Sequence, residues 1–258
     1  MELGLASCFS FLRGASDAAD LAWAARNLGY DAIGIADANS LAGAVRLHTE
    51  AKALNLRPVI GCRIETAEGL AFLAYPEDRA AYGRLCRLIS AGRMRTLDGE
   101  WQEKGVCAIS LEMLAGHAEG LRLVLIPPRD LETGFATGAA AAMPFAEMAA
   151  HLASCLPGLR HIAASYLYAG NDIARIAALD ALARGCGLSI LANNDVLYHA
   201  PDRRPLHDVM TAIRHRTRVA RAGHLLEDNA ERHLKSPEEM ARLFARWPHA
   251  IAAARQVA

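Results

Sequence analysis

The chain contains 258 residues, of which 53% are apolar, and its 28 basic and 28 acidic side chains give a net charge of zero. A chain of this length buries roughly three-quarters of its unfolded surface, so it can form a large core without disulfide bonds. Proteins whose main task is to grip nucleic acid usually carry a basic excess, so the balanced charge leaves room only for local basic patches.

Short apolar segments alternate with helical segments along the chain. Ser16 is expected to cap the first helix and Ser40 the second, because serine oxygens accept backbone hydrogen bonds at helix starts. The expected strands are 3–7, 31–37, 57–64, 69–74, 106–109, 121–126, 160–167 and 188–193, and the expected helices are 18–28, 41–54, 77–89, 111–116, 144–156, 172–185, 206–214 and 237–244.

Strands separated by helices of about 10–15 residues are typical of βαβ units and a parallel sheet. About seven such units favour a closed or nearly closed α/β barrel over an open sheet. In barrels of this kind the working residues collect at the carboxyl ends of the strands. The candidate site is therefore expected at those ends.

The cysteines and the apolar runs indicate the compartment. Six cysteines are widely spaced, with no Cys-x-x-Cys pair. No uncharged apolar run approaches the ~20 residues of a membrane-spanning helix, and no basic segment of a signal peptide opens the sequence. We therefore expect reduced thiols in a cytoplasmic protein without membrane contact.

Few side chains that bind metals follow the expected strands. Asp37 ends the second strand, Glu65 follows the third, and Asp195 comes after the last one. Hydrolytic metal sites usually combine histidines with carboxylates, and no histidine stands at any of these strand ends. The residues alone therefore indicate at most a weak metal site.

Several motifs resemble those of bacterial error-prone DNA polymerases of the C family, which includes DNA polymerase III alpha. They are 9–16 (FSFLRGAS), 194–196 (NDV), 203–209 (RRPLHDV) and 229–240 (NAERHLKSPEEM). In that family the corresponding region is the polymerase-and-histidinol-phosphatase (PHP) domain, a distorted (β/α)7 barrel related to the TIM barrel. The resemblance implies an α/β fold and one PHP domain over residues 1–258, whose segment from about 205 leads towards a polymerase palm outside this sequence.

The resemblance also implies where metal ligands would stand. Metal-binding members carry His-x-His on the first strand, Asp-His after the second, a glutamate on the third and Asp-x-His after a late strand. Only Asp37 and Asp195 keep a ligand in this sequence. The other positions of this vestigial site hold Gly4, Ala6, Ala38, Arg63 and Leu197.

These substitutions predict a largely dismantled metal site. Glycine, alanine and leucine side chains offer no lone pair, and Arg63 would place a permanent cation where divalent ions should lie. Two aspartates are too few for Zn²⁺, although they could hold Mg²⁺ weakly through water. We hypothesise that Arg63 forms an ion pair with Asp37 or Asp195 in place of the metals.

Three structural or substitute roles stay open at these positions. Asp37 is equally expected to cap the helix that follows it, and Asn194 and Asp195 to form an Asx turn after the last strand. His199 could replace a lost ligand.

The resemblance implies a structural domain without a cofactor, in a parent enzyme that performs damage-tolerant DNA synthesis. Its implied partners are the palm and fingers of the parent chain, with DNA and other mutasome proteins as further ones. One alternative is a residual phosphoesterase or pyrophosphatase that binds Mg²⁺ or Zn²⁺ through Asp37 and Asp195, helped by Glu65 or His199. Another is a metal-independent binding module recruited by a mutasome protein.

A basic stretch near the end of the sequence has two interpretations. Between residues 203 and 221 it holds six arginines but only one carboxylate. One interpretation is a surface that contacts DNA phosphates, and the other is a helix face that meets the next domain. The candidate DNA-contacting residues are Arg203, Arg204, Arg214, Arg216 and Arg218.

Overall fold

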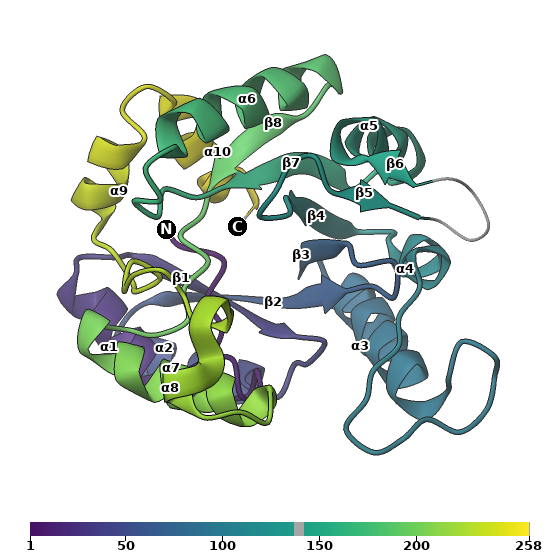
Figure 1. The fold of residues 1–258 in the computed structure, drawn as a ribbon, viewed down its shortest axis with the longest axis horizontal. Coiled ribbons are helices and arrows are strands. Elements are labelled where there is room, and N and C mark those ends of the chain that lie inside the picture. The colour runs from purple at the N-terminus through teal and green to yellow at the C-terminus, as the bar shows by residue number, and fades with distance from the viewer. Residues whose placement is uncertain (137–141, 258) are drawn as a thin grey trace.

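The computed structural model describes residues 1–136 and 142–257 and contains a curled, mixed sheet with helices packed on its outside (Figure 1). The α/β class and the PHP-like curled sheet agree with the sequence-based expectation. The strands are β1 (Ala32–Ala38), β2 (Arg57–Glu65), β3 (Ala71–Pro76), β4 (Leu121–Ile126), β7 (Leu159–Ala164) and β8 (Ser189–Ala192), and they lie in that order across the sheet.

We had expected a parallel sheet, but the observed sheet is mixed. β3 runs antiparallel to both β2 and β4, whereas the other neighbouring pairs are parallel. The cause is the connection between β2 and β3, which is only the turn at residues 66–70, with Gly69 at φ +85°. A parallel pair needs a crossover of a dozen or more residues, so a turn this short forces the antiparallel arrangement.

The first expected strand, 3–7, is not a regular strand, but it joins the two edges of the sheet. The Gly34 amide donates to the Glu2 carbonyl at 2.8 Å on the β1 side. On the other side, the Ala6 amide donates to the Val196 carbonyl at 2.9 Å, just after β8. The N-terminal segment therefore lies between the two edges and gives the sheet its barrel-like curl.

The helices begin and end close to the expected positions, with some differences. Asp17, not Ser16, caps α1. Ser40 does not cap the second helix, which begins at Ala44 after Gly43; the Ser40 hydroxyl accepts from the Ala42 amide instead. The expected strand 106–109 is irregular. The outer helices are α1 (Ala18–Asn27), α2 (Ala44–Ala53), α3 (Arg79–Met94), α4 (Leu111–His117), α5 (Phe145–Cys155) and α6 (Asp172–Gly185).

The chain after β8 contains more helices than the two that the sequence predicts. Arg204–Arg214 (α7) and Pro237–Leu243 (α9) agree with them, and the others were not expected. No helix in the part of the chain that the structure describes is long and apolar enough to cross a membrane. The remaining elements are β5 (Gly134–Phe135), β6 (Met143–Pro144), η1 (Pro201–Arg203), α8 (Val219–Ala222), η2 (Gly223–Leu225) and α10 (Pro248–Val257).

The last helix, α10, fills part of the interior of the curled sheet. It lies against β8, and its small side chains Ala253 and Ala254 let the helix backbone approach closely. Val257 completes this face of α10. The sheet and the N-terminal segment contribute Leu3, Ala36, Leu73, Tyr75, Val124, Ala163 and Leu191 to the same buried cluster.

Candidate functional site

A cavity of about 790 Å³ lies at the mouth of the curled sheet, where the sequence places the candidate site. Its wall includes Arg63 and Glu65 from the end of β2 and Asn193 and Asp195 from the segment after β8. Segments 126–129 and 227–232 complete much of the rim. The cavity therefore gathers side chains from segments that are far apart in the sequence.

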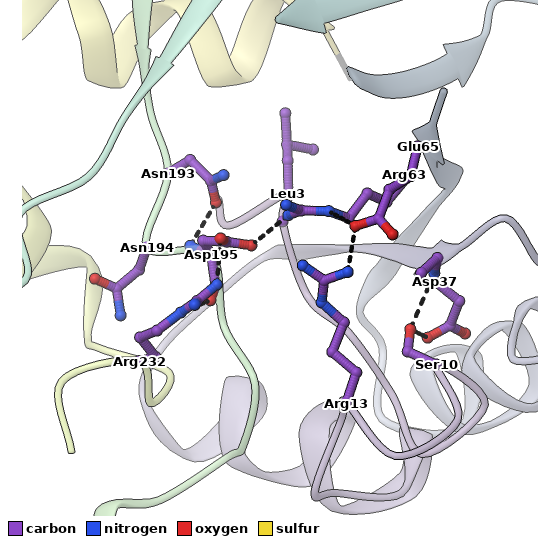
Figure 2. A network of polar contacts seen from close by, with 12 residues as sticks. Leu3, Ser10, Arg13, Asp37, Arg63, Glu65, Asn193, Asn194, Asp195 and Arg232 are labelled. Atoms are coloured by element: carbon purple, nitrogen blue, oxygen red, sulfur yellow. Dashed lines mark hydrogen bonds and ion pairs between the residues drawn. The ribbon is translucent and has the colours of Figure 1, made fainter. Parts of the chain in front are cut away.

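Arginine and carboxylate side chains form a network across this cavity (Figure 2). Arg63 Nη1 lies 2.9 Å from Asp195 Oδ1, and Arg63 Nε lies 2.9 Å from Glu65 Oε1. Arg13 forms a second ion pair with Glu65, and Arg232 forms a second one with Asp195. Each of these two carboxylates is thus held by two guanidinium groups.

Asp195 lies at the centre of the network. Burial opposes its ionisation, but Arg232 and Arg63 outweigh burial and lower the pKa of Asp195 to about 2. Its backbone has a φ of +46°, and its amide donates to Asn193 Oδ1 at 2.8 Å. The Asx turn therefore forms at Asn193, one residue before the expected position, and Asn194 instead donates to the carbonyls of the 231–233 segment.

Asp37 does not take part in this network. Its oxygens accept from the Ser7 amide at 2.8 Å and from the hydroxyls of Ser7 and Ser10 at 2.8 and 2.7 Å. Burial raises the pKa of Asp37, and these hydrogen bonds partly oppose the rise. Asp37 does not cap α2, whose N-cap residue is Gly43. The Asp37 carboxylate lies close to Gly43, where an added Cβ would be 2.4 Å from it.

Strand geometry explains why the two aspartates are apart. Successive side chains of a strand point to opposite faces, so Asp37 shares the face of Ile35, which packs in the cluster beneath α1 and α2. Arg63 pairs in register with Ala38 and faces the cavity. The ion pair that we expected for Arg63 is confirmed with Asp195. No cation pairs with Asp37 among residues 1–136 and 142–257.

The other vestigial positions have non-metal neighbours. A Cβ at Gly4 would lie 2.3 Å from Asn193 Oδ1, so this position has no room for a side chain. Ala6 and Leu197 lie in one buried apolar cluster. The Ala38 amide donates to the Ser10 hydroxyl at 3.0 Å.

The remaining candidate ligand, His199, is bound elsewhere. Its Nδ1 lies 2.8 Å from the Ser16 hydroxyl, and its amide donates to the same oxygen at 2.9 Å. His199 is not part of the wall of the main cavity. Ser16, which we expected to cap a helix, therefore holds His199 instead.

The side chains of the cavity do not fit a divalent metal ion. No group of three or more histidine, cysteine, aspartate or glutamate side chains is arranged to bind one within the described residues. Both oxygens of Asp195 face guanidinium groups, at Arg63 and Arg232. Two guanidiniums next to the metal position would repel a cation.

Two residues of the network were missed in the sequence. Arg13 lies in the motif 9–16 and Arg232 in the motif 229–240, and both motifs had been noted for their resemblance alone. Arg232 also pairs with Glu227 at 2.8 Å. The available signal was the arginine that each of these two motifs contains.

The five candidate DNA-contacting arginines are in different environments. Arg203 pairs with Asp20 at 3.2 Å, and Arg204 pairs with Asp208 at 2.6 Å while also donating to backbone carbonyls of segment 227–229. Both side chains thus have partners within the domain. Arg214, Arg216 and Arg218 are exposed and form no ion pair with any described residue.

The chain is similar to a known protein family and to bacterial polymerases. A family profile described as "PHP domain" matches residues 2–167. The error-prone DNA polymerase of Caulobacter vibrioides is 46% identical over 251 residues, covering 97% of this chain and 22% of that enzyme. The error-prone DNA polymerase of Brucella abortus is 42% identical over 257 residues, again with 22% of its length covered. The chain thus spans about a fifth of the length of these relatives.

Solved structures share the fold at low sequence identity. A Bifidobacterium adolescentis protein, described as a metal-dependent phosphoesterase, superimposes with a TM-score of 0.52 and 15% identity, and 95% of each chain is covered. An amidohydrolase from Chromobacterium violaceum gives a TM-score of 0.52 at 13% identity, with 74% of this chain covered. These similarities describe the architecture.

Proposed function

We propose that this chain is the structural PHP domain of a bacterial error-prone DNA polymerase and that ion pairs have replaced its metal ions. The chain belongs to the PHP domain family, whose profile matches residues 2–167. The parent enzyme would extend DNA past damage in the bacterial cytoplasm, using carboxylates of a palm outside these 258 residues. The partners of this domain would be that palm, the fingers and other mutasome proteins. Identity of 40–46% to polymerases named error-prone supports this assignment.

The observation that carries the proposal is the pair of guanidiniums on Asp195. An arginine side chain keeps its charge at any physiological pH, so Arg63 cannot give way to a metal by losing a proton. The two arginines neutralise the carboxylate that a metal would otherwise share. Asp195 therefore serves as the central acceptor of a structural network.

The network has a structural use because it joins remote segments. Arg13 comes from the N-terminal loop, Arg63 from β2, Asp195 from the segment after β8, and Arg232 from the segment before α9. Removing one partner of a buried ion pair typically costs about 3–5 kcal/mol because the other charge is left uncompensated. A fold whose strands meet through a bridging N-terminal segment gains stability from such cross-links.

An activity assay separates this proposal from the residual hydrolase. The purified 258-residue chain would be incubated with a phosphodiester and with pyrophosphate, each in Mn²⁺ and in Zn²⁺. We expect no turnover above that of the buffer. Asp195→Ala is the test variant, and Asp202→Ala, which removes an exposed carboxylate in η1, is its matched control. Turnover that Asp195→Ala abolishes and Asp202→Ala preserves would refute the structural role.

A further inference from the structure

Helix α7 exposes apolar residues to solvent and buries polar ones, the reverse of an ordinary surface helix. Leu206, Val209 and Ile213, at helical spacing, are 43%, 46% and 57% exposed. The polar residues His207 and Thr211 are instead 2% and 0% exposed, against the body of the fold. A surface helix normally turns its apolar stripe to the core and its polar face to water. We call the exposed residues Leu206, Val209 and Ile213 the α7 stripe.

The two buried polar residues of α7 gain little from their burial, and the apolar contacts of this helix come from Ala212, which is buried, and Met210, which packs against the cluster of Ala6, Ala15, Leu197 and Tyr198. His207 Nδ1 and Thr211 Oγ1 are buried without a hydrogen-bond partner among the described residues. Such groups lose their hydration and cost free energy, so the local contacts of these two residues do not explain the orientation of the helix. The buried ring of His207 contacts the ring of Tyr198, with 5.8 Å between the ring centroids.

Polar contacts at the start of α7 fix its rotation. Arg204 pairs with Asp208 one turn later and also donates to the carbonyls of Glu227 and Asn229. The helix therefore cannot turn its stripe inward without breaking these contacts. A stripe that is held outward by the fold is suited to a surface that covers it.

Apolar and basic side chains extend the stripe. Val219 in α8 and Leu225 in η2 are also exposed, and α8 contacts α7. Arg214 ends α7, and Arg216 and Arg218 follow it; all three are exposed and without ion pairs among the described residues. The apolar surface thus has basic side chains at the C-terminal end of α7, which we call the positive rim.

We infer that the α7 stripe is the surface on which the polymerase portion of the parent chain docks, through an apolar patch rimmed by carboxylates. This inference rests on the proposed function. In the relatives this region is 22% of a much longer chain, and domains within one chain bury apolar area against their neighbours. The positive rim selects carboxylates on the partner and disfavours a second copy that would bring a like-charged rim nearby.

DNA is a less suitable occupant of the same surface. Phosphate contacts require hydrogen-bond donors, and single-strand platforms require aromatic side chains. The stripe consists of Leu206, Val209 and Ile213, which provide neither. The arginines beside the stripe can donate to phosphates, but DNA would leave the apolar stripe uncovered, whereas a protein surface with an apolar patch and carboxylates would cover both.

A site-specific crosslinking experiment tests this inference in a full-length enzyme. The matched region of the Caulobacter vibrioides error-prone polymerase would be replaced by this chain, with a photoreactive phenylalanine at Val209. The control carries the same group at Val45 on α2, which is 76% exposed and outside the stripe. We expect crosslinks from position 209 to peptides of the polymerase portion, at least tenfold more abundant than those from position 45.

Other outcomes would overturn the inference. They are crosslinks from position 209 only between two copies of the enzyme, crosslinks only to added DNA, or equal yields at the two positions. The aligned positions in the unmodified Caulobacter enzyme give a second measurement that does not depend on how the hybrid folds. The hydrolysis assay above judges the proposed function separately, since an active hydrolase can still crosslink through α7 and an inactive one can fail to.

Discussion

Removing Arg63 tests the cavity network directly, because this side chain contacts both of its central carboxylates. Arg63→Ala removes the contacts at 2.9 Å to Asp195 and to Glu65, and its own side chain is only 10% exposed. Both carboxylates keep one arginine, Arg232 and Arg13 respectively. The loss should therefore fall somewhat below the full cost of an orphaned buried charge, at about 2–3 kcal/mol of the free energy of unfolding.

Urea unfolding of the 258-residue chain, followed by tryptophan fluorescence and circular dichroism, measures this loss. Arg214→Ala is the matched control, because Arg214 is exposed and without an ion pair among the described residues, and we expect it to change the free energy by less than about 0.5 kcal/mol. Arg63→Met should recover part of the loss by restoring buried volume. If Arg63→Ala is as stable as Arg214→Ala, the network does not hold the fold together.

Three further predictions concern single positions. The pKa of Asp195 is lowered from 3.8 to about 2, so its contribution to stability is complete above pH 4 and is lost as the pH falls towards 2, by about 2 kcal/mol. Urea midpoints over this range should show the loss, and Asp195→Asn should remove it. Burial raises the pKa of Glu2 from 4.5 to about 7, so stability should fall by about 3 kcal/mol as the pH rises from 4.5 through 7, and a flat profile in the wild type would contradict this. Gly4→His should destabilise the chain by about 1–3 kcal/mol through its clash with Asn193, which the same urea assay measures. Metal analysis of this variant should show no gain of metal binding.

The sequence predicted most elements but not all their directions. The alternation of apolar segments located β1, β2, β4, β7 and β8 to within a few residues. It could not show that β3 reverses, because direction depends on the length of the turn at Gly69 and not on the composition of the strand. It also missed α10, although its buried residues Ala250, Ala253, Ala254 and Val257 recur at helical spacing.

The candidate site was only partly predictable, because side-chain direction and loop path depend on the three-dimensional fold. Arg63 and Asp195 were identified as positions of the vestigial site, and charge predicted that Arg63 pairs with Asp37 or Asp195 without choosing between them. Asp37 was expected in the same site, but the alternation of side chains along β1 turns it to the opposite face. Arg13 and Arg232 join the site through loops whose path the sequence pattern does not encode. Residues on strands were therefore easier to place than residues on loops.

We propose that ion pairs, not metal ions, occupy the mouth of this PHP domain. Titration calorimetry of the purified chain with Mn²⁺ and with Zn²⁺, followed by mass spectrometry of the metal retained after dialysis, tests it most directly. We expect well below one retained ion per chain, both for the wild type and for Asp195→Ala. Retention of more than one ion per chain, reduced by Asp195→Ala but not by Asp202→Ala, would contradict it.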